Sequence, residues 1–172
     1  ALASALPTAQ AFRLCGGSGP PYPQYALSRD PASGALWASC RQQARLHRIS
    51  PASGETRAIL RLTSTPYSIA AGLGAVWSAE RGPVVNRIDL RTGRGTTAVS
   101  GGGFSYIWTA AGSVWAADDE ASALMRYDPA GAKTDVFRQY TGRTNGLAMA
   151  KDGTVYGAQE GGRRVVQCLK DG

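Results

Sequence analysis

The chain has 172 residues, of which 43% are hydrophobic and 18% are charged, and its formal net charge at pH 7 is +7. No run approaches the roughly eighteen apolar residues of a membrane span, so we expect no transmembrane segment. One histidine and the lack of any Cys-x-x-Cys pair exclude a zinc site of the Cys/His type. The basic residues are scattered without an aromatic-and-basic stripe, so we expect no nucleic-acid partner.

The first eleven residues are small and apolar and end in Ala9-Gln10-Ala11, which is typical of a signal-peptide cleavage site. We interpret 1–11 as the remnant of a secretory signal peptide and 12–21 as a lead-in strand or linker; a disordered Ala-rich leader is the alternative for 1–11. The protein is then expected to be exported, that is secreted, periplasmic or at the cell surface. An oxidising compartment would allow Cys15 and Cys40 to form a disulfide, and two free thiols are the alternative.

One phrase then returns four times at a spacing of about 40 residues: a Gly, a hydrophobic pair ending in an aromatic, and two small residues. The recurring aromatics are Trp37, Trp77, Trp115 and Tyr156. Strand chemistry at this period is typical of the blades of a β-propeller, so the sequence predicts an all-β fold. We expect the four aromatics to be largely buried on the second strands of successive blades. The predicted blades cover 22–62, 63–100, 101–142 and 143–172.

A second phrase keeps the same period and reads as a strand that runs into a tight turn, as in Val85–Gly93. Each unit therefore holds about four short strands. In the second unit these strands are predicted at 67–71, 75–80, 84–89 and 95–99. Within this phrase Cys168 aligns with Ile49, Ile88 and Tyr127, which predicts a buried thiol. Arg48, Arg87 and Arg126 share another position, which indicates a structural role or ordinary solvation.

Polar residues recur where propellers bind ligands, on the face built by the loops from second to third strands and from blade to blade. The candidate residues on this rim are Glu80, Asp118, Asp119, Asn145 and Glu160, with Glu120 beside them. Their oxygens could together hold a divalent ion such as Ca²⁺, Mn²⁺ or Zn²⁺, and ordinary exposed turns are the alternative. The lone His47 lies on a third strand away from this rim, and we expect a surface or hydrogen-bonded strand histidine.

Two stretches resemble known families. Pro66-Tyr-Ser-Ile-Ala-Ala-Gly-Leu-Gly-Ala-Val-Trp77-Ser-Ala-Glu80, followed by Asn86-Arg-Ile88, resembles a blade of the streptogramin B lyase-like propellers. Thr144-Asn-Gly-Leu147 with Glu160-Gly-Gly-Arg-Arg-Val165 resembles the gluconolactonase/senescence-marker-protein family. Both families are six-bladed, so the resemblance implies an N-terminal fragment of a six-bladed ring; a four-bladed ring closed by 11–15 is the alternative. In the lactonase-like family the Asn of this phrase binds a divalent metal, which implies Asn145 as a metal ligand.

Three functions follow from these resemblances: a ligand- or protein-binding propeller, a metal-dependent lactone or ester hydrolase, and a carbon–oxygen lyase. The lactonase-like metal site needs a Glu where this chain has Pro23-Gln24-Tyr25. The histidines and the glutamate of the lyase come from blades beyond the four found here. We therefore expect a binding domain with its site on the rim, whose ligand is a small molecule or a protein.

Overall fold

The computed structural model describes residues 25–40, 43–62, 64–80, 83–102 and 104–169, and all its regular structure is β. The described residues form four antiparallel sheets, which follow one another along the chain. The first sheet contains β1 (Tyr25–Arg29), β2 (Leu36–Cys40), β3 (Arg45–Ile49) and β4 (Thr56–Arg61). The second contains β5 (Pro66–Gly72), β6 (Ala75–Glu80), β7 (Val84–Asp89) and β8 (Gly95–Ser100). The third contains β9 (Phe104–Ala110), β10 (Ser113–Asp118), β11 (Ala123–Asp128) and β12 (Lys133–Arg138). The fourth contains β13 (Thr144–Met149), β14 (Val155–Gln159) and β15 (Arg164–Cys168).

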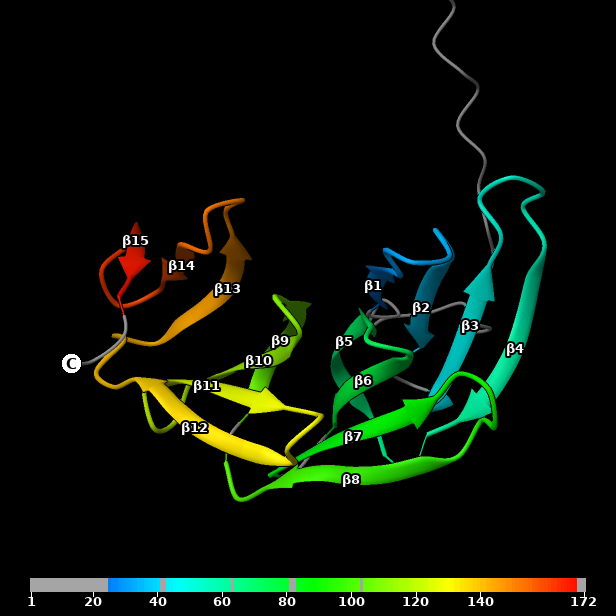
Figure 1. Ribbon diagram of the computed structural model, residues 1–172, viewed down its shortest axis with the longest axis horizontal. Coiled ribbons are helices and arrows are strands. Elements are labelled where there is room, and N and C mark those ends of the chain that lie inside the picture. Colours follow the sequence, from blue (N-terminus) through cyan, green and yellow to red (C-terminus); the bar gives the residue numbers. More distant parts are fainter. Residues whose placement is uncertain (1–24, 41–42, 63, 81–82, 103, 170–172) are drawn as a thin grey trace, which may run out of the picture.

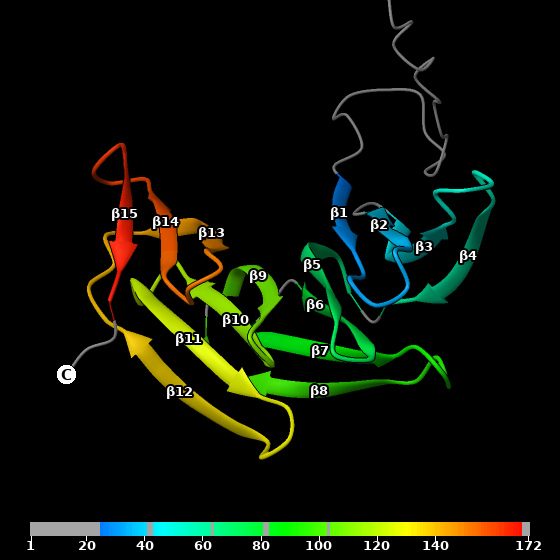
Figure 2. The ribbon, with the colours of Figure 1, turned by 45° about the horizontal axis from the view of Figure 1, so that its top comes forward.

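The four sheets stand side by side around a common axis as the blades of a propeller, with the first strand of each sheet innermost (Figures 1 and 2). The predicted all-β propeller is thereby confirmed, and the strands of the second sheet match those expected from the sequence within one residue. Together the sheets form an open arc, in which the first and fourth sheets lie on either side of the open part (Figure 1). The described residues therefore do not form the closed four-bladed ring that the sequence left open.

Side chains on the innermost strands fix each blade against its neighbour. The Ser28 hydroxyl of β1 accepts a hydrogen bond from the Ala71 amide of β5 at 2.8 Å, and Thr109 Oγ1 of β9 donates to the Ala71 carbonyl at 2.9 Å. Ser68 Oγ likewise accepts from the Ile107 amide at 3.2 Å. Backbone groups that a sheet edge would leave unpaired thus find partners in the next blade, which sets the blades in one register.

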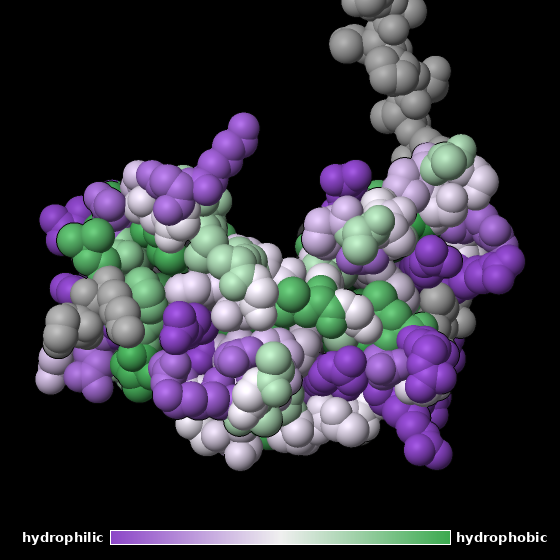
Figure 3. Space-filling model, in the orientation of Figure 1, coloured by the Kyte–Doolittle hydropathy of each residue, from purple (hydrophilic) through white to green (hydrophobic). Residues whose placement is uncertain are grey.

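The hydrophobic core lies between consecutive sheets, and the repeated tryptophans are at its centre. Trp37 and Trp115 are each 4% exposed, and Trp77 is fully buried with its ring edge-on to Tyr127 at 5.7 Å between centroids. Tyr156 corrects the expectation for the fourth aromatic, because 40% of it is exposed. No further sheet among the described residues covers the outer face of the fourth sheet. Figure 3 shows apolar side chains on that part of the surface, in line with the exposure of Val165.

The cysteines and the histidine differ in their surroundings. Cys40 is disulfide-bonded, and Cys168 is a free, buried thiol whose pKa is raised by burial. Cys15 lies outside the described residues, as do the segments predicted as signal-peptide remnant and lead-in strand. The expectation for His47 is wrong: only 6% of it is exposed and its Nε2 has no hydrogen-bond partner. Burial, aided by Arg45, lowers the pKa of this imidazole.

Candidate functional site

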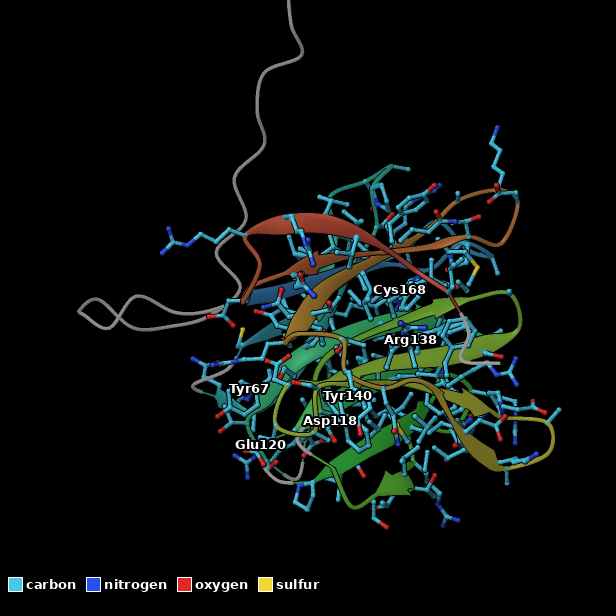
Figure 4. The ribbon with its side chains drawn as sticks, turned by 90° about the vertical axis from the view of Figure 1, so that its left-hand side faces the viewer. Tyr67, Asp118, Glu120, Arg138, Tyr140 and Cys168 are labelled. Carbon is cyan, nitrogen blue, oxygen red and sulfur yellow. The ribbon has the colours of Figure 1, made fainter. Side chains whose placement is uncertain are left out.

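A cavity of about 930 Å³ opens at the end of the sheets where second strands end and first strands begin. The antiparallel pairing explains why polar residues from several blades meet there, since Pro66 pairs with Glu80 and Phe104 pairs with Asp118. Figure 4 shows Tyr67, Asp118 and Glu120 at this same end of the molecule. The walls come from the second, third and fourth sheets and their connections. Its lining residues include Tyr67, Glu80, Ser105, Asp118, Asp119, Glu120 and Arg143.

Glu80 is part of the wall but its carboxylate is occupied by the fold. It is 2% exposed, and its Oε2 accepts hydrogen bonds from the Ser64 amide at 2.7 Å and the Ser64 hydroxyl at 2.8 Å. Its Oε1 accepts from the Ser78 hydroxyl at 2.8 Å. A buried carboxylate is tolerated when its oxygens are satisfied in this way. Glu80 therefore fastens the connection into the second blade and is a poor candidate for binding a ligand.

The end of β10 and the loop that follows it supply the other three carboxylates of the cavity, Asp118, Asp119 and Glu120. Asp118 Oδ1 accepts from the Ala121 amide at 2.9 Å, and its Oδ2 lies against Gly102, where a Cβ would stand only 2.8 Å away. Asp119 Oδ1 is buried and has no hydrogen-bond partner. The next residue, Glu120, is exposed. An unsatisfied buried acceptor costs about 1–3 kcal/mol, so Asp119 is the group in this cavity for which a donor from a ligand would matter most.

The connection from the third to the fourth sheet adds a cation to the cavity wall and also carries a tyrosine, Tyr140, which is not among the lining residues. Arg143 lines the cavity and forms an exposed ion pair with Glu160, with 3.5 Å between nitrogen and oxygen. Tyr140 is 90% exposed, and its neighbour Thr141 is bonded through its amide to the Ser122 carbonyl of the β10–β11 loop at 2.8 Å. Tyr140 and Arg143 both have a left-handed backbone, with φ of 56° and 57°. Such conformations are sparsely populated and gather at functional segments.

The structure brings together only some of the residues that the sequence singled out. Glu80, Asp118 and Asp119 line the cavity, whereas Asn145 and Glu160 do not. Asn145 Oδ1 accepts from the adjacent Gly146 amide at 2.7 Å. Tyr67 and Arg143 were not predicted as site residues, although each lies where an innermost strand begins. Their position at the start of the first strand of a blade was the feature of the sequence that could have identified them.

The donor set does not fit a divalent metal ion. Across the described ranges, no three side chains of His, Cys, Asp or Glu come close enough to bind one. The two oxygens of Glu80 are engaged by serines, and Asn145 stands apart from the cavity. We therefore derive no chemistry from a metal here. In the same described part of the chain, no helix has the length and apolar character needed to cross a bilayer.

Comparison with known proteins shows the fold. No protein-family profile and no curated protein matches the sequence. Virginiamycin B lyase from Staphylococcus aureus superposes with a TM-score of 0.64 at 16% identity, over 84% of this chain and 54% of the lyase. The gluconolactonase XC5397 from Xanthomonas campestris gives 0.70 at 17% identity, over 87% of this chain and 60% of the other.

A chain of a nidogen/laminin complex gives a TM-score of 0.71 at 16% identity, over 81% of this chain and 58% of that one. The present chain thus spans between 54% and 60% of the length of these three proteins. At such low identity the likeness concerns architecture. It shows that the chain has the β-propeller fold.

Proposed function

We propose that this chain is the ligand-binding β-propeller domain of an exported protein, and that its acidic cavity takes a ligand bearing an ammonium or guanidinium group. The single observation that carries the proposal is the buried, unsatisfied Asp119 Oδ1 in the wall of a large cavity. A cationic donor is the partner that this oxygen lacks. Charge-assisted hydrogen bonds of this kind are about twice as strong as neutral ones.

The distribution of charge supports a cationic ligand. The chain carries 12 acidic and 19 basic residues, yet four of the 12 carboxylates line this one cavity. Glu80 is satisfied internally, and Arg143 is offset by Glu160. Asp118, Asp119 and Glu120 then remain as the charges that a ligand would meet. A focused negative potential on a basic protein attracts cations to this site and away from the rest of the surface.

One tyrosine adds an aromatic surface for such a ligand. Tyr67 lines the cavity and is 44% exposed. An ammonium or guanidinium group over an aromatic face gains about 0.5–1 kcal/mol at an exposed site. The combination of carboxylates and a tyrosine suits a lysine or arginine side chain, or a small amine.

Export is supported by the disulfide at Cys40, because structural disulfides persist in oxidising compartments. The alternatives of a lactone hydrolase and a carbon–oxygen lyase rest on the similarity to proteins with those names. A propeller hosts many unrelated activities, so this similarity does not favour either reaction. The described residues give the hydrolase no metal donor set. Binding is therefore the function that the site supports best.

The proposal is tested by calorimetric titration of the full chain with N-acetyl-lysine amide, beside the neutral N-acetyl-norleucine amide. We expect the lysine compound alone to bind, and Asp119→Asn to weaken it about tenfold, the equivalent of one charge-assisted hydrogen bond. Asp152→Asn is the matched control, because Asp152 lies in an exposed turn outside the cavity. Equal binding of both compounds, or no difference between Asp119→Asn and Asp152→Asn, contradicts the proposal.

A further inference from the structure

A second cavity, of about 610 Å³, lies between the first and second sheets at the opposite end of the strands from the acidic cavity. Glu80 at the end of β6 lines the acidic cavity, whereas Asp89 at the end of the returning strand β7 lines this one. Trp37, Leu60 and Leu90 form its apolar wall, and Arg48 and Arg91 are also part of the lining. This volume falls within the roughly 300–1,000 Å³ of small-molecule sites.

The tryptophan of this cavity departs from the repeat. Trp77 Nε1 donates to the Gly72 carbonyl and Trp115 Nε1 donates to the Ala110 carbonyl, both at 3.2 Å. Trp37 is equally well buried, but its Nε1 has no hydrogen-bond partner. Buried indole N–H groups almost always have an acceptor, so this one requires an explanation.

The explanation lies in the loop before each tryptophan. Two-residue turns, 73–74 and 111–112, join the first and second strands of the second and third sheets. Each turn leaves the last carbonyl of the first strand beside the indole. In the first sheet the connection is the longer segment 30–35, whose own turn is closed by the Asp30 carbonyl accepting from the Gly34 amide at 2.8 Å. By register, Asp30 is equivalent to Gly72 and Ala110, so the carbonyl at this position accepts from its own turn, and Trp37 Nε1 has no partner.

The facing blade departs from the repeat at the same place. Trp77 packs on Tyr127 of the third sheet, and Trp37 belongs to the same core cluster as Ile88 of the second sheet. Ile88 and Tyr127 are equivalent, since they pair with Val76 and Val114 on the second strands of their sheets. Ile88 lines an adjoining cavity of about 270 Å³ and not the one at Trp37, and the two cavities share Leu60 and Gly93.

The polar groups around the cavity are biased toward donors. The Asp30 carboxylate accepts from the Ala32 and Ser33 amides and from the Ser33 hydroxyl. The Asp89 carboxylate is occupied in the same manner by its own turn, through the amides of residues 91 and 92 and the Thr92 hydroxyl. Asp89 also pairs with Arg87 at 3.4 Å, and the charge of Arg48 helps to lower the pKa of Asp30. The cavity is thus lined by carboxylates that are already bonded, by two arginines, and by a tryptophan whose buried indole N–H has no partner.

We propose that this cavity is a second ligand site, which takes an organic carboxylate with an apolar body. The carboxylate would accept hydrogen bonds from Arg91, Arg48 and the Trp37 indole, and the apolar body would lie against Leu60 and Leu90. Guanidinium groups match a carboxylate with two parallel N–H donors. The acidic cavity at the other end repels such a ligand, so the two sites select opposite charges and are separable by experiment.

The test is a titration of the full chain with hexanoate, followed by calorimetry and by the indole N–H resonances in a ¹H–¹⁵N spectrum. The Trp37 resonance is assigned with a Trp37→Phe variant. We expect hexanoate to shift that resonance and Arg91→Gln to weaken binding about tenfold, the loss of one charge-assisted hydrogen bond. Arg163→Gln, an exposed change in the turn between β14 and β15, is the matched control and should bind as the unaltered chain does.

Two further comparisons separate this site from the acidic cavity. Asp119→Asn should leave hexanoate binding unchanged, and hexylamine should not move the Trp37 resonance. A stationary Trp37 resonance on addition of hexanoate, equal affinity of Arg91→Gln and Arg163→Gln, or an equal response to hexylamine would each overturn the proposal. Arg91 is exposed, so Arg91→Gln should fold as the unaltered chain does.

Discussion

Truncating two equivalent aromatics should have unequal effects on the free energy of unfolding. Trp77 is fully buried, donates a hydrogen bond to the Gly72 carbonyl and packs edge-on against Tyr127. Trp77→Ala should therefore cost about 5 kcal/mol, the upper end of the range for a buried tryptophan. Tyr156 holds the same place in the fourth sheet but is 40% exposed. Because the cost scales with the apolar area removed from water, Tyr156→Ala should cost about 2 kcal/mol.

Denaturant unfolding followed by circular dichroism measures this difference, provided that the two variants and the unaltered chain share one slope with denaturant concentration. A difference of about 3 kcal/mol in the free energy of unfolding is expected. Trp115→Ala serves as a further comparison, since Trp115 is 4% exposed and should behave like Trp77. Equal costs for Trp77→Ala and Tyr156→Ala would refute the assignment of the core to the spaces between consecutive sheets.

Three other variants test particular contacts. His47 is the only histidine of the chain and burial lowers its pKa, so the unfolded state binds the proton more readily. The free energy of unfolding should be highest above the ordinary pKa of about 6.5 and should decline as the pH falls below that value. In unfolding curves measured between pH 5 and 7.5, His47→Leu should make this decline smaller. An unchanged decline would contradict the prediction. Gly72→Ala places a Cβ 2.6 Å from Thr109 Oγ1 at a φ of 150°, so the melting temperature should fall, and Thr109→Ala should recover part of the loss. If Thr109→Ala recovers none of the lost melting temperature, the loss is due to backbone strain at residue 72 and not to the contact with Thr109. Glu80→Ala leaves three donors of Ser64 and Ser78 unpaired and should cost about 3 kcal/mol or more, while Glu80→Gln, which keeps an acceptor, should cost less by the same unfolding assay.

The fold could be predicted because its signal is periodic. Each blade repeats a strand with alternating apolar residues and a turn with Asp, Pro or Gly, so independent copies of one pattern give the same strand positions. Val84–Asp89 shows how well this works, since its bounds were predicted without error. The exposure of Tyr156 could not be predicted, because burial depends on which sheet lies opposite. The repeat predicts the strands within one blade, but it does not predict which surface covers that blade.

The position of the candidate site could be predicted from the sequence, but the roles of its individual residues could not. The repeat placed Glu80 and Asp118 at the same end of neighbouring blades, and both line one cavity. It could not show that Glu80 is held by Ser64, because a contact between residues 16 apart leaves no trace in local composition. Asn145 was predicted from its place at the entry to a blade and from a resemblance to lactonase-like proteins, whereas in the structure its oxygen accepts a hydrogen bond from the next amide. The residue type of Asn145 indicates that its side-chain oxygen could bind a ligand, but the nearest hydrogen-bond donor in the fold determines what that oxygen binds.

The blades also show where a repeat protein can acquire a second site. In the second and third sheets the indole N–H is satisfied by the carbonyl before a two-residue turn, so these positions are structural and closed. In the first sheet the connection is longer, the Trp37 Nε1 has no hydrogen-bond partner, and Trp37 lines a cavity of about 610 Å³. A donor without a partner and without space beside it would be a packing defect, and space without a donor would be an ordinary void. The coincidence of a donor and a cavity at Trp37 distinguishes a binding site from a packing defect.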